Sequence, residues 1–257
     1  MLKMRVIPTL LWKDLGLVKG IGFDSWRRVG TAMPSIKVYN TREVDELILV
    51  DITASAAKRE PDYDAISDLA AECFVPLTFG GGVNSIEIIR NILKAGADKV
   101  AINSAAFERP ELITEASDKF GAQCVVASID VRKNSNGTYE AYRLSGTQPT
   151  GKEVVGWAKK LEELGAGEIL LTSIERDGTM EGYDLDLIRA VTQAVQIPVI
   201  ASGGVGNYEH MYQAIHAAGA SAVAAASIFH FTEQTPLEAK KYLAEKGISV
   251  RNTSVRS

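Results

Sequence analysis

Short runs of apolar and β-branched residues alternate along the chain with stretches in which apolar residues recur every three or four positions. The runs predict eight strands, over residues 5–11, 46–52, 76–80, 99–103, 124–130, 168–173, 198–202 and 222–226. The stretches between them predict helices that include residues 63–73, 85–95, 110–120, 152–164, 186–194 and 208–218. Alternating strands and helices are typical of parallel βαβ units, and eight units in 257 residues predict a single (β/α)8 (TIM) barrel.

The chain also repeats itself once. The segment VPLTFGGGV, which begins at Val75, is echoed by IPVIASGGV at Ile197, 122 residues later. The segments GADKVAINSAAF and ELILVDITAS have similar counterparts 123 and 122 residues further on. An internal repeat of this length predicts one domain, residues 1–257, built from two half-barrels that span approximately residues 1–122 and 123–257.

Composition narrows the class of protein. Apolar residues make up 46% of the chain, the net charge is −4 and no basic block is present, which argues against nucleic-acid binding. No apolar run is long enough for a membrane span and no signal-peptide pattern is present, so we expect a cytoplasmic protein. Cys73 and Cys124 are expected to be reduced core residues. The histidines lack metal-ligand spacing, and we expect neither a metal nor a cofactor.

Small residues follow matched strands in the two halves. In barrels of this type, ligands bind at the C-terminal ends of the strands. The matched sets are Gly80, Gly81, Gly82, Asn103 and Ser104 in the first half, and Gly203, Gly204, Ala226 and Ser227 in the second. Backbone N–H groups in such turns bind anions, so the duplication predicts two phosphate sites and a substrate with a phosphate at each end. The alternative is that the glycines only form tight turns.

Ionisable and hydroxyl side chains lie at the same strand ends. Asp51, Asp130 and Asp177 are candidate acids or bases, or otherwise helix caps and turn residues, as the sequence Asp177-Gly178 suggests. Thr172 and Ser202 add hydroxyl groups. The glycine-rich segment 15–34, which contains Lys19, predicts a long mobile loop that covers the mouth. We expect the tryptophans, Trp26 among them, to serve packing.

A second group of charges begins the strands, at the opposite end of the barrel. Arg5, Glu46, Lys99 and Glu168 are the first residues of four strands, and the alternation of side chains points them inward. Two acids and two bases would cancel as a ring, because an unpaired buried charge is costly. The ring is either a structural layer or a gate that closes a passage along the barrel axis.

The segments VDELILVDITAS, FGGGV, GADKVAINSAA, GAGEILLTSIERDGT and IASGGVG resemble the cyclase subunit of imidazole glycerol phosphate synthase, over essentially the whole chain. The resemblance implies a barrel that docks a class I glutaminase on its N-terminal face and passes ammonia through a charged gate to a bis-phosphate substrate. By position, it assigns the gate to Arg5, Glu46, Lys99 and Glu168. It assigns phosphate binding to Gly82, Asn103, Ser104, Asp177, Gly204 and Ser227, and substrate contacts to Lys19, Asp51, Thr172 and Ser202.

The chain departs from this family at its catalytic pair. The family works with two aspartates, on the first and fifth strands; here Asp130 is present, but Leu11 stands at the other position. The repeat also places Leu11 opposite Asp130, although the interval of 119 residues leaves that alignment open. Loss of a general acid or base costs about 10²–10⁴-fold in rate. The segments RVIPTLLWKDLGLVKG and AECFVPLTFGGGV resemble a paralogous branch of the family associated with surface-glycan (O-antigen) synthesis.

Three functions follow from these observations. The first is an ammonia-conducting subunit that, with its glutaminase and a third, sugar-amidating enzyme, converts an acetamido to an acetamidino group. The second is a working cyclase of histidine biosynthesis, a lyase that forms imidazole glycerol phosphate and AICAR. The third is a scaffold that activates the glutaminase and binds a phosphorylated ligand as a signal.

Overall fold

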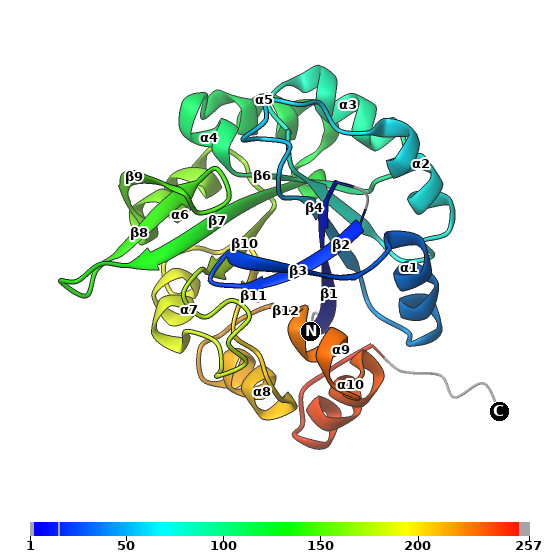
Figure 1. Ribbon diagram of the computed structural model, residues 1–257. Helices are drawn as coiled ribbons and strands as arrows, with labels where there is room; N and C mark the ends of the chain where they lie inside the picture. The colour runs from blue at the N-terminus through cyan, green and yellow to red at the C-terminus, as the bar shows by residue number, and fades with distance from the viewer. Residues whose placement is uncertain (1–2, 15, 252–257) are drawn as a thin grey trace.

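Eight parallel strands close into a barrel in this computed structural model, which describes residues 3–14 and 16–251. Each strand pairs with the next around the ring, and β10 pairs with β7 to complete the circle (Figure 1). The (β/α)8 barrel predicted from the sequence is therefore confirmed. Its strands are β1 (Arg5–Lys13), β4 (Leu47–Asp51), β5 (Leu77–Gly80), β6 (Lys99–Ile102), β7 (Val125–Lys133), β10 (Glu168–Ser173), β11 (Val199–Ser202) and β12 (Ala222–Ala225).

Helices surround the barrel on its outside (Figure 1). Several begin at a side chain that accepts a hydrogen bond from the first turn, as Asp62, Ser85 and Asp184 do. The six predicted helices are present, and further helical segments join them. The full set is α1 (Ala32–Thr41), α2 (Tyr63–Ala71), α3 (Ile86–Lys94), α4 (Ser104–Glu108), α5 (Glu111–Phe120), the 3₁₀ turn η1 (Ala122–Cys124), α6 (Val154–Glu163), α7 (Leu185–Thr192), α8 (Tyr208–His216), α9 (Ser227–Phe231) and α10 (Pro236–Glu245).

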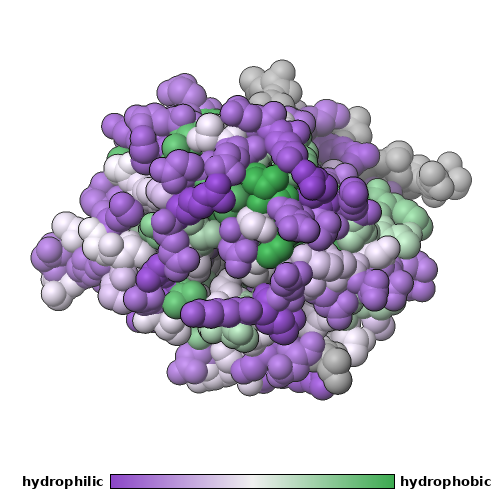
Figure 2. Space-filling model, turned by 90° about the horizontal axis from the view of Figure 1, so that it is seen from above, coloured by the Kyte–Doolittle hydropathy of each residue, from purple (hydrophilic) through white to green (hydrophobic). Residues whose placement is uncertain are grey.

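Apolar side chains form two separate layers. The larger one lies between the sheet and the helices, and the smaller one fills the barrel interior. The interior cluster consists of Ile7, Ile48, Ala101, Val126, Leu170, Ile200, Ala222 and Ala224. Outside, hydrophilic side chains predominate and apolar ones form small patches (Figure 2). In the described part of the chain, none of the helices has the length and apolar character that crossing a membrane requires.

Two antiparallel hairpins extend the barrel at its C-terminal end. The predicted loop over residues 15–34 is wrong: β2 (Gly16–Ile21) and β3 (Asp24–Gly30) pair with each other, and β2 also pairs with β1. Leu15 lies outside the described residues. Gly22 and Phe23 both have positive φ, as the two-residue hairpin turn requires. The second hairpin, β8 (Tyr139–Arg143) with β9 (Gln148–Glu153), continues from β7. In Figure 1 the β2–β3 hairpin lies across the centre of the ring of strands.

The strand register relates the two halves of the barrel. Leu11 in β1 lies beside Val50 in β4, and Asp130 in β7 lies beside Thr172 in β10. Thr172 is 122 residues after Val50, the interval that separates the repeated segments. Leu11 therefore occupies in the first half the position that Asp130 occupies in the second.

A buried ion pair ties the last helix to the N-terminal end of the barrel. Lys240 in α10 is 2% exposed, and its ammonium group lies 3.2 Å from Asp45 Oδ1 and also donates to the carbonyl oxygen of Glu43. The other oxygen of Asp45 accepts a hydrogen bond of 2.9 Å from the backbone N–H of Val6. Removing the Asp45 carboxylate would leave the buried ammonium group of Lys240 without its counter-charge. It would also take away the acceptor of the Val6 N–H.

We therefore expect Asp45→Ala to lower the free energy of unfolding by about 3–5 kcal/mol, measured by urea denaturation. The matched control is Glu72→Ala, which breaks the exposed ion pair with Lys37 and should cost less than about 1 kcal/mol. Equal losses in the two variants would contradict this account of the Lys240 pair.

Candidate functional site

A single pocket at the C-terminal ends of the strands gathers most of the residues singled out in the sequence. It is covered in part by the β2–β3 hairpin, which contributes Lys19, Phe23 and Trp26 to its wall. Leu11 lines it as well. The other sequence-predicted residues that line it are Asp51, Asn103, Ser104, Asp130, Thr172, Asp177, Gly178, Ser202, Gly203, Gly204, Ala226 and Ser227.

Gly82 is the exception among the predicted anion-binding residues. It is buried behind the pocket wall, and its backbone N–H donates a hydrogen bond of 3.1 Å to the Ser55 hydroxyl oxygen. Ser55 lines the pocket in its place. Because the Ser55 oxygen accepts from Gly82, its own proton remains available to a ligand. The first-half turn therefore presents a serine hydroxyl to the pocket at the point where the sequence predicted a glycine amide.

Asp51 is held by its own loop. One of its carboxylate oxygens accepts hydrogen bonds from the N–H and hydroxyl groups of Thr53 and from the N–H of Ala54. The other lies 2.6 Å from Arg59 Nη2. Asp51 thus folds the loop after β4 and carries a compensated charge where it borders the pocket.

Lys19 and Asp177 join the hairpin to the loop after β10. Lys19 is 2% exposed, and its ammonium group lies 2.5 Å from Asp177 Oδ2. The Gly22 N–H also donates to the carbonyl oxygen of Asp177 at 2.8 Å. A Cβ atom on Gly178 would lie 2.1 Å from the Gly20 carbonyl oxygen, so the two backbones approach as closely as only glycine allows. The hairpin is therefore seated on the second half of the barrel.

The surroundings of Asp130 in the pocket perturb its ionisation. Burial, and secondly the charge of Asp177, raises the pKa of Asp130 from its usual 3.8 to about 7. Asn103 Nδ2 donates a hydrogen bond of 3.0 Å to one of its oxygens. A carboxyl group with a pKa near neutrality can both accept and return a proton, which is the property that a general acid or base needs.

Three residues that line the pocket carry buried polar atoms for which the described part of the chain provides no hydrogen-bond partner. Thr9 Oγ1, Asn103 Oδ1 and Ser227 Oγ are buried and, within the described residues, have no hydrogen-bond partner. Buried polar groups are nearly always hydrogen-bonded, and an unpaired one costs free energy. All three border the pocket, so a bound ligand that supplies donors and acceptors would satisfy them.

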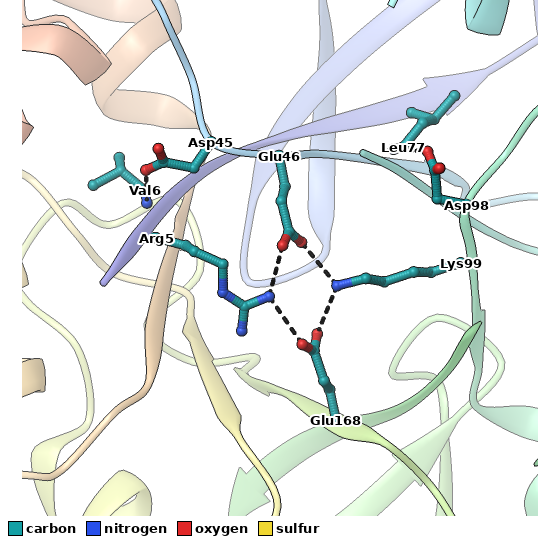
Figure 3. Close-up of polar contacts among 8 residues, drawn as sticks. All are labelled: Arg5, Val6, Asp45, Glu46, Leu77, Asp98, Lys99 and Glu168. Atoms are coloured by element: carbon teal, nitrogen blue, oxygen red, sulfur yellow. Dashed lines mark hydrogen bonds and ion pairs between the residues drawn. The ribbon is translucent and has the colours of Figure 1, made fainter. Parts of the chain in front are cut away.

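At the opposite end of the barrel, four charged side chains form a closed ring (Figure 3). Arg5 Nη1 lies 2.7 Å from Glu46 and 2.9 Å from Glu168, and Lys99 Nζ lies 3.1 and 3.2 Å from the same two carboxylates. Burial alone would lower the pKa of the Arg5 guanidinium, but the charges and hydrogen bonds of the two glutamates together raise it. The ring is neutral overall, because each charge touches two of the opposite sign.

The ring and the pocket lie on one axis, separated by the interior apolar cluster. Ala101, Leu170 and Ala224 belong to that cluster and also line the pocket. Arg5 and Lys99 are the first residues of their strands, whereas the pocket lies at the strands' far ends. Charge, apolar filling and a polar cavity therefore follow one another along the barrel.

Several pocket residues were not anticipated. Ser55, Ser145, Thr9 and Ser128 add hydroxyl groups to the wall, and Trp26 lines the pocket although it was expected to serve packing. Ser55 lies in the repeated DITAS segment just after a strand, a signal that could have found it. Ser145 comes from the β8–β9 turn, which no sequence pattern indicated, and its hydroxyl donates to the carbonyl oxygen of Ile52 at 2.7 Å.

A family model described as "Histidine biosynthesis protein" matches residues 5–235, which is most of the chain. The matched range begins at the first charge of the ring and includes every pocket residue named above.

Because the pKa of Asp130 is raised in the folded protein, the free energy of unfolding should depend on pH. Between pH 4 and 7 the folded protein retains a proton on Asp130 that the unfolded chain releases, so stability falls as the pH rises through this range. We expect Asp130→Asn, measured by urea denaturation, to match the wild type near pH 4 and to be the more stable protein at pH 7.5. A stability difference that is constant across these pH values would contradict the shift. In Asp177→Asn, the pKa of Asp130 should be lower because the neighbouring negative charge is removed. The fall in stability should therefore end at a lower pH.

Proposed function

Because the chain belongs to the histidine biosynthesis protein family, we propose that it is the synthase subunit of a glutamine-dependent amidotransferase. In this proposal it takes ammonia from a class I glutaminase docked on its N-terminal face. The ammonia serves a third enzyme that converts an acetamido to an acetamidino group on a surface-glycan sugar. The observation that carries the proposal is Leu11, which stands at the counterpart of Asp130 while the ring of four charges is complete.

The layers along the barrel axis suit the passage of ammonia. The interior apolar cluster separates the ring from the pocket, and neutral ammonia enters such a layer far more readily than ammonium does. The ring lies at the start of this path and pairs Arg5 and Lys99 with two glutamates. An incoming molecule would have to displace one of these ion pairs, which is the action of a gate.

The pocket supports only half of a ring-closing reaction. Such a reaction needs a general acid and a general base, and leucine can be neither. Among the described residues, the other pocket carboxylates are each held by a cation, Asp51 by Arg59 and Asp177 by Lys19. Asp14, the next carboxylate after Leu11, does not line the pocket. Asp130 is therefore left without an evident catalytic partner.

The cyclase of histidine biosynthesis is the second candidate. Asp130, with its pKa of about 7, and the Ser227 hydroxyl, which has no hydrogen-bond partner in the described part of the chain, favour it. Both would serve a phosphorylated substrate that undergoes proton transfer. This candidate requires an acid supplied by the substrate or by water in place of Leu11.

Cyclase turnover separates the two candidates. With N'-phosphoribulosyl formimino aminoimidazole carboxamide ribonucleotide and ammonium salt, we expect the wild type to form little imidazole glycerol phosphate. Leu11→Asp should raise the rate by about 10²–10⁴-fold, because it restores the second proton-transfer group. Leu11→Asn, which has the shape of aspartate without its ionisation, is the control. A wild type that turns over as fast as an active Leu11→Asp variant would contradict the amidation proposal.

The gate can be tested in the complex with the cognate glutaminase. We expect Lys99→Met to uncouple the two activities, so that glutamine is hydrolysed but its nitrogen appears as free ammonia and not in the amidated product, followed with ¹⁵N-labelled glutamine. Lys99→Arg, which retains the charge, should preserve most of the transfer. Full nitrogen transfer in Lys99→Met would show that the ring is only a structural layer.

A further inference from the structure

Asp130 lacks a positively charged partner in the part of the chain that the structure describes. The other two pocket carboxylates differ in this respect, because Asp51 is bound by Arg59 and Asp177 is bound by Lys19. Lys19 is also the only lysine or arginine among the described residues that line the pocket. Ionisation of Asp130 therefore puts a negative charge into the pocket without a counter-ion, which is costly away from water.

The amide of Asn103 places an acceptor next to this carboxylate. Its Nδ2 group faces two acceptors, Asp130 Oδ2 at 3.0 Å and the carbonyl oxygen of Tyr142 at 3.4 Å, and these contacts determine the orientation of the amide. Asn103 Oδ1 is buried and has no hydrogen-bond partner among the described residues. Because an amide oxygen can only accept a hydrogen bond, this atom needs a ligand that donates one.

Hydroxyl groups add further acceptors to the same pocket. Thr172 is 7% exposed and lies beside Asp130 in the register of β10 and β7. Thr9 Oγ1 is buried and without a partner in the described ranges, and Thr9 follows Ile7, a member of the interior apolar cluster, by two residues. Thr9 and Thr172 both line the pocket. The acceptors therefore gather at the floor of the pocket, where the apolar layer of the barrel ends.

We infer that the floor of the pocket binds a small cation that carries N–H groups, either an ammonium ion or a primary ammonium group, between the Asp130 carboxylate and Asn103 Oδ1. Such a cation supplies both the counter-charge and the hydrogen-bond donors that these two residues lack. It has no acceptor atom that would face their oxygens. The cation site itself requires neither a glutaminase nor a sugar.

The same site would retain ammonia, and this consequence rests on the proposed function. Ammonia that reaches a protonated Asp130 takes up the proton, so that a carboxyl group and ammonia become a carboxylate and an ammonium ion. The pKa of Asp130, about 7, favours this direction, because amines are stronger bases than a carboxylate with such a pKa.

Carbon-13 NMR of the Asp130 carboxyl group tests the site in the chain alone. Its resonance is identified by its absence in Asp130→Asn, and it is titrated with ammonium chloride in place of sodium chloride at constant ionic strength. Because the cation binds the ionised carboxylate, a concentration about ten times its Kd should lower the apparent pKa by about one unit. Propylammonium chloride distinguishes the two sources: a larger shift than that of ammonium indicates the end of a larger amine, and a smaller shift indicates the free ion.

Potassium chloride and tetramethylammonium chloride are the control salts, because both cations carry the charge without N–H groups. Each should lower the apparent pKa of Asp130 by less than ammonium does. A shift with potassium equal to that with ammonium would overturn the inference, and so would the absence of a shift with both ammonium and propylammonium.

Variants of the acceptors test the proposed ligands. Asn103→Leu should abolish most of the ammonium-dependent shift and Thr9→Val should reduce it, because each removes an acceptor oxygen. Asp64→Asn is the matched control, since it removes an exposed carboxylate on α2 that does not line the pocket, and it should leave the shift unchanged. Thermal melting checks that each variant is folded. A full shift in both Asn103→Leu and Thr9→Val would contradict the site.

Discussion

The hydrogen-bonded closure of the parallel sheet is the constraint on which the rest of this structure depends. Arg5 in β1 lies beside Ala222 in β12, and Leu11 lies beside Val50 in β4, so the first strand is fixed on both sides. In a strand, a slip of one residue would turn every inward side chain outward. Closure therefore decides at once that Arg5 enters the ring, that Ile7 enters the apolar cluster and that Leu11 reaches the pocket.

The order of layers along the axis follows from this register. Charges at the strand starts compensate one another, the middle of the barrel is apolar, and the far end gathers hydroxyl and carboxyl groups around a cavity. Each layer favours a different state of a small solute: the ring tolerates a charge, the apolar layer excludes it, and the pocket presents hydrogen-bonding groups. Asp130 belongs to the third layer. Because its pKa is raised, its carboxyl group keeps a proton at pH values at which a carboxyl group in water would have lost it.

The sequence predicted those parts of the molecule that local pattern controls. Apolar runs located the barrel strands, and the charged residues at the predicted strand starts identified the ring, although Glu46 lies just before β4 in the structure. The β2–β3 hairpin was missed because its pairing depends on β1, and its exposed residues do not alternate with apolar ones. The contact of Lys19 with Asp177 spans 158 residues and has no local signal. That Ser55 lines the pocket while Gly82 does not could not be predicted, because it depends on how the folded loop directs the Gly82 N–H to the Ser55 hydroxyl oxygen.

The seating of the hairpin on the loop after β10 limits how the two halves of this barrel can evolve. The repeat suggests interchangeable modules. However, the lack of a side chain at Gly178 lets the Gly20 backbone approach closely, and Asp177 contacts both Lys19 and Gly22. A half-barrel exchanged with that of a relative would carry one side of this contact without the other. Recombination between such genes should therefore preserve residues 16–30 and 174–182 as a co-inherited pair, even where the rest of each half is replaced.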